Sequence, residues 1–67
     1  MLNTMELLEL NKKALYCMVE HRRAFGGDWA FGQPERAWYD ENGDFCVGYQ
    51  GGKWWHYREV DGNMEWW

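Results

Sequence analysis

Three turn signals divide the second half of this chain into short segments and constrain its fold more than any other feature. They are Asn42-Gly43, Gly51-Gly52 and Asp61-Gly62. Residues of these types accept the positive φ angles that tight hairpin turns need. The segments between the turns are rich in Trp, Tyr, Phe and Val, which suit a pleated, half-buried sheet. We therefore expect antiparallel strands at about 36–41, 44–50, 53–60 and 63–67.

The first third of the chain has the periodicity of one amphipathic helix over residues 3–25. Asn3 can cap its start, and Glu6 can bond back to the cap as in a capping box. Gly26-Gly27 ends the helix, because glycine tolerates the left-handed cap conformation. The residues of its apolar stripe are Leu7, Leu10, Ala14, Met18, His21 and Phe25.

Residues 26–35 form a linker that contains Trp29, Phe31 and Pro34. The two rings either tuck under the edge of the sheet and help close the core, or form a loop tip that grips a ligand. We expect the first arrangement, because large apolar side chains are mostly buried. Together the elements predict a single α+β domain, with one N-terminal helix packed on a three- to four-stranded antiparallel meander.

Two-residue loops at the first two turn signals would set the strand register, with Tyr39 opposite Cys46 and Trp55 opposite Gly48. Side chains alternate between the faces of a sheet, so two sets result. The first set is Trp38, Phe45, Val47, Tyr49, Trp54, His56, Arg58 and Val60. The second set is Ala37, Tyr39, Cys46, Gly48, Trp55, Tyr57 and Trp66. A three-residue third turn would exchange Trp66 for Trp67 in the second set.

We expect the first set to face the helix, because its Phe and Val side chains have no polar group and gain most from burial. Its charged members and the neighbouring Asp40 count against this choice, since buried charges need partners. The second set then leaves an exposed aromatic row on the other side of the sheet. The candidate contact surface is Tyr39, Trp55, Tyr57 and Trp66.

Composition narrows the classes of function. The chain has 67 residues with six Trp, four Tyr and three Phe, which is more ring surface than one face of a small sheet can use. Its net charge of −4 argues against a nucleic-acid partner. No apolar run is long enough to span a bilayer, so we expect no membrane partner. The N-terminus lacks the pattern of an export signal, which predicts a cytoplasmic protein whose two cysteines stay reduced.

Residues with metal-binding or catalytic chemistry do not converge in the expected register. Cys17 and His21 lie four apart on the helix, a spacing that can hold a metal ion. Cys46 and His56 would have to complete the site, and they are expected on opposite faces of the sheet. A nucleophile also needs an orienting group and a pocket, for which the sequence gives no signal. We therefore expect no metal, no cofactor and no enzymatic activity.

The stretch from Lys53 to Trp67 resembles one unit of the cell-wall-binding repeats of choline-binding and glucan-binding proteins. Those repeats carry an aromatic pair, an acidic-Gly turn, a Met and a closing Trp. The matching residues are Trp54, Trp55, Tyr57, Gly62, Met64 and Trp66. The match covers less than half of the chain, and we interpret it as convergence on aromatic hairpins. The resemblance implies a carbohydrate or choline-like ligand stacked on aromatic rings.

The surplus of aromatic residues therefore predicts a small non-enzymatic interaction module. Its aromatic sheet face would bind a protein partner or a second copy of the chain. Binding of a carbohydrate or a quaternary amine by aromatic stacking is the alternative.

Overall fold

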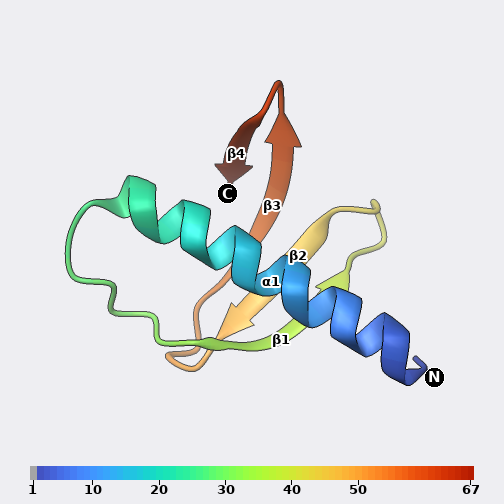
Figure 1. Cartoon of the computed structure of the whole chain (residues 1–67). Helices are drawn as coiled ribbons and strands as arrows, with labels where there is room; N and C mark the ends of the chain where they lie inside the picture. The colour runs from blue at the N-terminus through green and yellow to red at the C-terminus, as the bar shows by residue number, and fades with distance from the viewer. Residues whose placement is uncertain (1) are drawn as a thin grey trace.

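The computed structural model describes residues 2–67, and Figure 1 shows one helix lying across a four-stranded sheet. The helix α1 spans Thr4–Phe25. The strands are β1 Pro34–Tyr39, β2 Phe45–Tyr49, β3 Trp54–Val60 and β4 Asn63–Trp66. They lie side by side in chain order and every neighbouring pair is antiparallel. The predicted α+β fold, with an N-terminal helix on an antiparallel meander, is confirmed.

Both ends of α1 have the predicted caps. The backbone N–H of Glu6 donates to the Asn3 side chain at 2.9 Å, and the Asn3 N–H donates to the Glu6 carboxylate at 3.3 Å. At the other end Gly26 takes a left-handed conformation with φ of 70° and donates its N–H to the Arg22 carbonyl. Within residues 2–67, no helix is both long enough and apolar enough to cross a membrane.

The loop of the first hairpin has three residues instead of the predicted two. Asp40 N–H donates to the Asp44 carbonyl at 3.0 Å, which makes these two residues the last pair of the ladder. Between them Gly43 takes a φ of 83°, as in a type I turn followed by a left-handed residue. Tyr39 therefore pairs with Phe45, and the predicted pairing with Cys46 is wrong by one residue.

The second hairpin has the same loop length. Tyr49 N–H donates to the Lys53 carbonyl at 2.8 Å, and Gly52 takes the left-handed conformation with φ of 92°. Trp55 consequently pairs with Val47, whereas the sequence predicted Gly48 as its partner.

The third hairpin keeps the two-residue loop. Asp61 and Gly62 both have positive φ, at 52° and 81°, as a type I′ turn requires. Tyr57 therefore pairs with Trp66, and these two residues share a face as predicted.

The core lies between α1 and one face of the sheet, which we call the inner face. The one-residue shift in each of the first two hairpins turns β1 and β3 over relative to β2. The predicted inward set was therefore right for β2 and wrong for the other strands. The residues that form the core or pack against it are Leu10, Ala14, Cys17, Met18, Trp29, Phe31, Ala37, Phe45, Val47, Tyr49, Trp55, Tyr57, Met64 and Trp66. Trp29 and Phe31 of the linker thus close the core, as expected.

Three polar side chains in this core satisfy one another. His21, which is 2% exposed, lies with Nδ1 2.7 Å from the Tyr57 hydroxyl, and that hydroxyl lies 2.7 Å from the hydroxyl of Tyr49. The Trp66 ring stacks on the His21 ring with centroids 4.2 Å apart. Burial lowers the pKa of His21 and raises the pKa of both tyrosines. Because each polar group has a partner, Tyr57 can be buried without an unpaired hydroxyl.

Candidate functional site

The residues predicted as a contact surface do share one face, but it is the inner face. Tyr57 is 3% exposed, and Trp55 and Trp66 are half-buried against the core. Tyr39 lies at the margin, 54% exposed, where its hydroxyl accepts a hydrogen bond from Lys13 at 2.9 Å. The prediction that these four residues face away from the helix is wrong, because it depended on the two-residue loops.

The opposite side of the sheet, which we call the outer face, carries a second aromatic row. Trp38 of β1 contacts Trp54 of β3, with ring centroids 5.6 Å apart. Trp54 contacts His56 at 4.9 Å, and His56 stacks on Trp67 at 4.8 Å with only 4° between the ring planes. We call these four residues the outer strip. Trp54 is 47% exposed and Trp67 46% exposed, although each contacts a neighbouring ring.

An arginine lies over each end of the outer strip. The Arg36 guanidinium lies 4.9 Å from the Trp38 ring, and the Arg58 guanidinium lies 5.3 Å from the Trp67 ring. Gly48 leaves room for the Arg36 side chain, because a Cβ there would come within 2.9 Å of the Arg36 Nε. We had expected Trp55 to lie opposite this glycine. The ends of the strip are therefore cationic while its centre is aromatic.

The sequence contained a signal for this surface. The set predicted to be buried included His56 and Arg58, and the flanking Asp40 is charged as well. Charged side chains on a predicted inward face indicate that the assignment of faces is reversed. Val60, also placed inside by that prediction, is 37% exposed.

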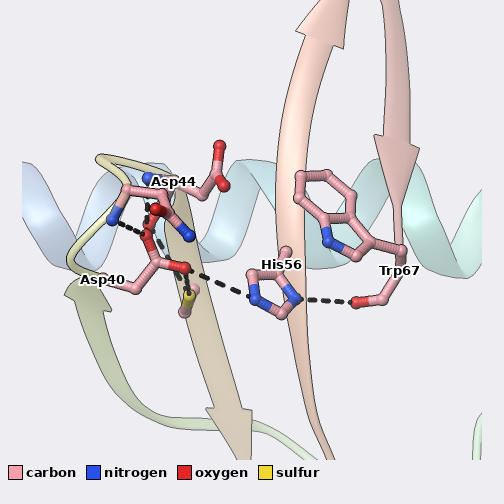
Figure 2. Close-up of polar contacts among 6 residues, drawn as sticks. Asp40, Asp44, His56 and Trp67 are labelled. Carbon is pink, nitrogen blue, oxygen red and sulfur yellow. Dashed lines mark hydrogen bonds and ion pairs between the residues drawn. The ribbon is translucent and has the colours of Figure 1, made fainter.

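Beneath the outer strip, three side chains from β2, β3 and the first hairpin turn converge (Figure 2). Asp40 Oδ2 lies 3.4 Å from His56 Nε2 and 4.0 Å from Cys46 Sγ. Within residues 2–67, this is the one group of three His, Cys or acidic ligand atoms that lie close together, all within 4.8 Å. The prediction that Cys46 and His56 point to opposite faces is wrong, because the two residues pair directly across β2 and β3.

The neighbours of this cluster hold each member in place. Asp40 Oδ1 accepts the backbone N–H groups of Asn42 and Asp44 at 3.0 and 2.9 Å. His56 Nδ1 lies 3.1 Å from the Trp67 carbonyl (Figure 2). Burial, followed by the carboxylates of Asp40 and Asp44, raises the pKa of Cys46, which is completely buried.

Cys17 and His21 lie on the other side of the sheet and do not join this cluster. Cys17 is 1% exposed, and burial raises the pKa of its thiol to about 11. Reactive cysteines are partly exposed and have a lowered pKa, so Cys17 does not have the properties of a nucleophile. Its role is packing in the core, as expected from sequence.

A second apolar surface lies on α1, away from the sheet. All residues from 2 to 9 are exposed, and in Figure 1 the first turns of the helix extend past the strands. Leu7, predicted to face the sheet, is 49% exposed for this reason, and Phe25 at the other end is 47% exposed. An outward row of apolar side chains runs along α1 from Leu8 through Leu15 to Val19, and these residues are 48%, 49% and 44% exposed. We call these three residues the helix stripe.

Comparison of the chain with protein-family models, curated proteins and solved structures found no match. Functional inference for this chain therefore starts from the outer strip, the cluster beneath it and the helix stripe.

Proposed function

We propose that this protein is a non-enzymatic interaction module that pairs with a second copy of itself through the outer strip. The observation that supports this proposal is the row of Trp38, Trp54, His56 and Trp67. These rings contact one another and leave two tryptophans nearly half exposed. Aromatic rings that are left this exposed on one face of a sheet are typical of a binding surface.

The composition of this surface favours a protein partner. Trp and Arg are enriched among the residues that dominate binding at protein interfaces, and the outer strip has three Trp with an Arg at each end.

The charges at the corners of the outer face favour a second copy as the partner. Arg36 on β1 makes no ion pair with any residue of the described chain. Glu65 on β4 lies at the opposite corner, paired with Arg58 at 3.2 Å where both side chains are largely exposed. If two outer faces pack with their strands crossing at about 90°, a two-fold axis brings Arg36 of each copy to Glu65 of the other.

Sedimentation equilibrium of the full chain tests this proposal. We expect a concentration-dependent species of twice the 8.1 kDa monomer mass. Trp54→Ala should weaken the pairing at least tenfold, about 1.4 kcal/mol, because interface tryptophans are frequent hot spots. The variant should fold, since Trp54 lies outside the core. A wild-type chain that stays monomeric at millimolar concentration would refute self-association.

The helix stripe supplies a matched control on the far side of the molecule. Leu8→Gln with Leu15→Gln removes exposed apolar area from α1 and leaves the outer strip intact. Pairing through the outer strip should be unchanged in this double variant. If instead the helix variant dissociates and Trp54→Ala does not, the two copies meet through α1 and the outer strip is not the interface.

Charge reversal tests the proposed geometry. Arg36→Glu alone should weaken the pairing by repelling Glu65 of the second copy, and adding Glu65→Arg should restore it. Restoration requires that the two side chains meet across the interface, so no recovery in the double variant would exclude this orientation of the two sheets.

Stacking of a small ligand on the outer strip is the alternative. Arg36, which has no ion pair within residues 2–67, places a cation at one end of the strip and disfavours a quaternary amine there, whereas Arg58 at the other end is paired with Glu65. Carbohydrate is therefore the better candidate. Saturable quenching of tryptophan fluorescence by an oligosaccharide, lost in Trp54→Ala, would favour this alternative. Cys17 and Cys46 lie on opposite sides of the sheet and are both free, and the proposal of a reducing compartment such as the cytoplasm rests on the sequence pattern alone.

A further inference from the structure

We propose that Asp40, Cys46 and His56 bind one divalent transition-metal ion, with zinc as the best fit. Thiolate, imidazole and carboxylate are the ligand types that zinc takes from proteins. Three protein ligands leave a fourth position for water, as in open zinc sites. This proposal concerns the cluster beneath the outer strip and does not depend on self-association.

The spacing of the three ligand atoms is close to that of a tetrahedral site. Zinc–ligand bonds of about 2.0–2.3 Å place neighbouring ligand atoms roughly 3.3–3.7 Å apart. The separation between Asp40 Oδ2 and His56 Nε2 is 3.4 Å, and that between Asp40 Oδ2 and Cys46 Sγ is 4.0 Å. All three atoms lie within 4.8 Å. Because the widest separation is up to 4.8 Å and Cys46 is buried, closing the site requires the side chains of Asp40 and His56 to rotate toward the Cys46 sulfur.

The hydrogen bond on the far side of His56 directs a lone pair into the cluster. The Trp67 carbonyl can only accept, so the His56 Nδ1 that contacts it at 3.1 Å must carry the hydrogen. In the neutral ring, Nε2 then has a lone pair facing the Asp40 carboxylate oxygen. A metal ion between these two atoms would receive an electron pair from each of them. An imidazole oriented by a carbonyl on its other nitrogen is the usual arrangement of a metal-bound histidine.

The other two ligands are oriented in the same way. One Asp40 oxygen holds the turn through two backbone N–H groups, which leaves Oδ2 directed at the cluster. Cys46 lies on the central strand β2 and is completely buried, so its sulfur has little freedom. A metal ion bound here would displace the proton of the Cys46 thiol, because only the thiolate is a metal ligand. Asp40 and His56 are partly exposed, with about a fifth of each side chain accessible, which gives an ion a path of entry.

Cobalt(II) titration of the reduced full chain tests the site, because thiolate ligation gives a near-ultraviolet charge-transfer band and tetrahedral geometry gives intense visible bands. We expect both bands, saturation at one ion per chain and displacement by zinc. Cys46→Ser should abolish the charge-transfer band. Cys17→Ser is the matched control, since it removes the other buried thiol on the far side of the sheet, and should leave the spectrum unchanged. Asp40→Asn and His56→Gln should each weaken binding at least about tenfold.

Absence of a thiolate band in the wild type would overturn the proposal, and so would a band that survives in Cys46→Ser. Circular dichroism of each variant distinguishes loss of a ligand from loss of the fold. Repeating the titration with Trp54→Ala keeps the test separate from self-association. Unaltered cobalt spectra in a monomeric Trp54→Ala chain would support the metal site even if the paired state did not exist.

Discussion

Replacement of His21 by Phe should remove most of the pH dependence of stability between neutral and mildly acidic pH. The His21 ring lies in the core between Trp66, Trp29, Trp55 and Tyr57. Burial lowers its pKa below the usual value of 6.5. The unfolded chain therefore takes up a proton more readily than the folded chain. The stability that neutral His21 provides is fully present above pH 6.5 and is lost as the pH falls toward the folded pKa.

The size of the effect follows from linkage. Between the two pKa values, the free energy of unfolding falls by about 1.4 kcal/mol for each pH unit. A single core in a chain of this length supplies roughly 3–5 kcal/mol. Lowering the pH by one unit within this window would therefore remove about a third of the free energy of unfolding. Phe keeps the aromatic stacking and removes the titration, and it loses the bond to Tyr57, which is worth about 0.5–1.5 kcal/mol.

Urea unfolding followed by tryptophan fluorescence at several pH values between 5 and 8 would measure this dependence. The wild-type midpoint should decrease as the pH is lowered while the slope m stays constant, and this decrease should be much smaller in His21→Phe. His56→Gln is the control, because it removes the other histidine of the chain from the opposite face of the sheet. Parallel curves for the wild type and His21→Phe would refute the assignment of this dependence to the buried ring.

Two further substitutions test the local structure by the same urea assay. Tyr57→Phe removes the middle hydroxyl of the buried hydrogen-bonded series His21–Tyr57–Tyr49. It should lower the free energy of unfolding by about 1–3 kcal/mol, because the polar groups of His21 and Tyr49 lose their partner. The control Tyr39→Phe removes a hydroxyl at the exposed margin and should cost less than about 0.5 kcal/mol. Equal losses of stability in the two variants would contradict the buried hydrogen-bonded series. Gly43→Ala forces alanine to a φ of 83° and should cost about 1–2 kcal/mol. Gly27→Ala is the control, because a Cβ added at Gly27 would meet open space, and it should change the free energy of unfolding by less than about 0.5 kcal/mol. An equally small change in Gly43→Ala would argue against the three-residue loop.

The sequence was sufficient to predict the elements because their signals are local. The helix cap at Asn3, the glycine at its end and the three turn signals each act within a few residues. The length of each loop was harder to predict from the sequence. Asn42-Gly43 and Gly51-Gly52 can each be the centre of a two-residue turn or the end of a three-residue loop. In the first hairpin, Asp40 decides between them by accepting two backbone N–H groups across the turn. That interaction cannot be recognised from the dipeptide alone.

A one-residue change in each loop had a large effect on the candidate site, because it exchanged the two faces of β1 and β3. The cluster of Asp40, Cys46 and His56 was missed for this reason, since Cys46 and His56 meet only in the observed register. Tyr57 was missed with it, because it also lies on β3, whereas Tyr49 of β2 was correctly predicted to face the helix. The Tyr57 hydroxyl also argued for an exposed position, and its partner His21 lies on another element.

In the predicted register and in the observed one, both faces of the sheet carry aromatic rings. The reason is the order of the aromatic residues in the sequence. They occur as adjacent pairs, namely Trp38-Tyr39, Trp54-Trp55 and Trp66-Trp67. Neighbours in a strand point to opposite faces, so each pair supplies one ring to the inner face and one to the outer face whatever the loop length. Such pairs cannot indicate which face is buried, because the apolar pattern is the same on both sides. The polar atoms decide which face is buried. The Tyr57 hydroxyl meets His21 on the inner face, whereas Asp40, His56 and Arg58 require the outer face. An aromatic outer face is thus a direct consequence of the paired rings, and its charged neighbours determine which rings form it.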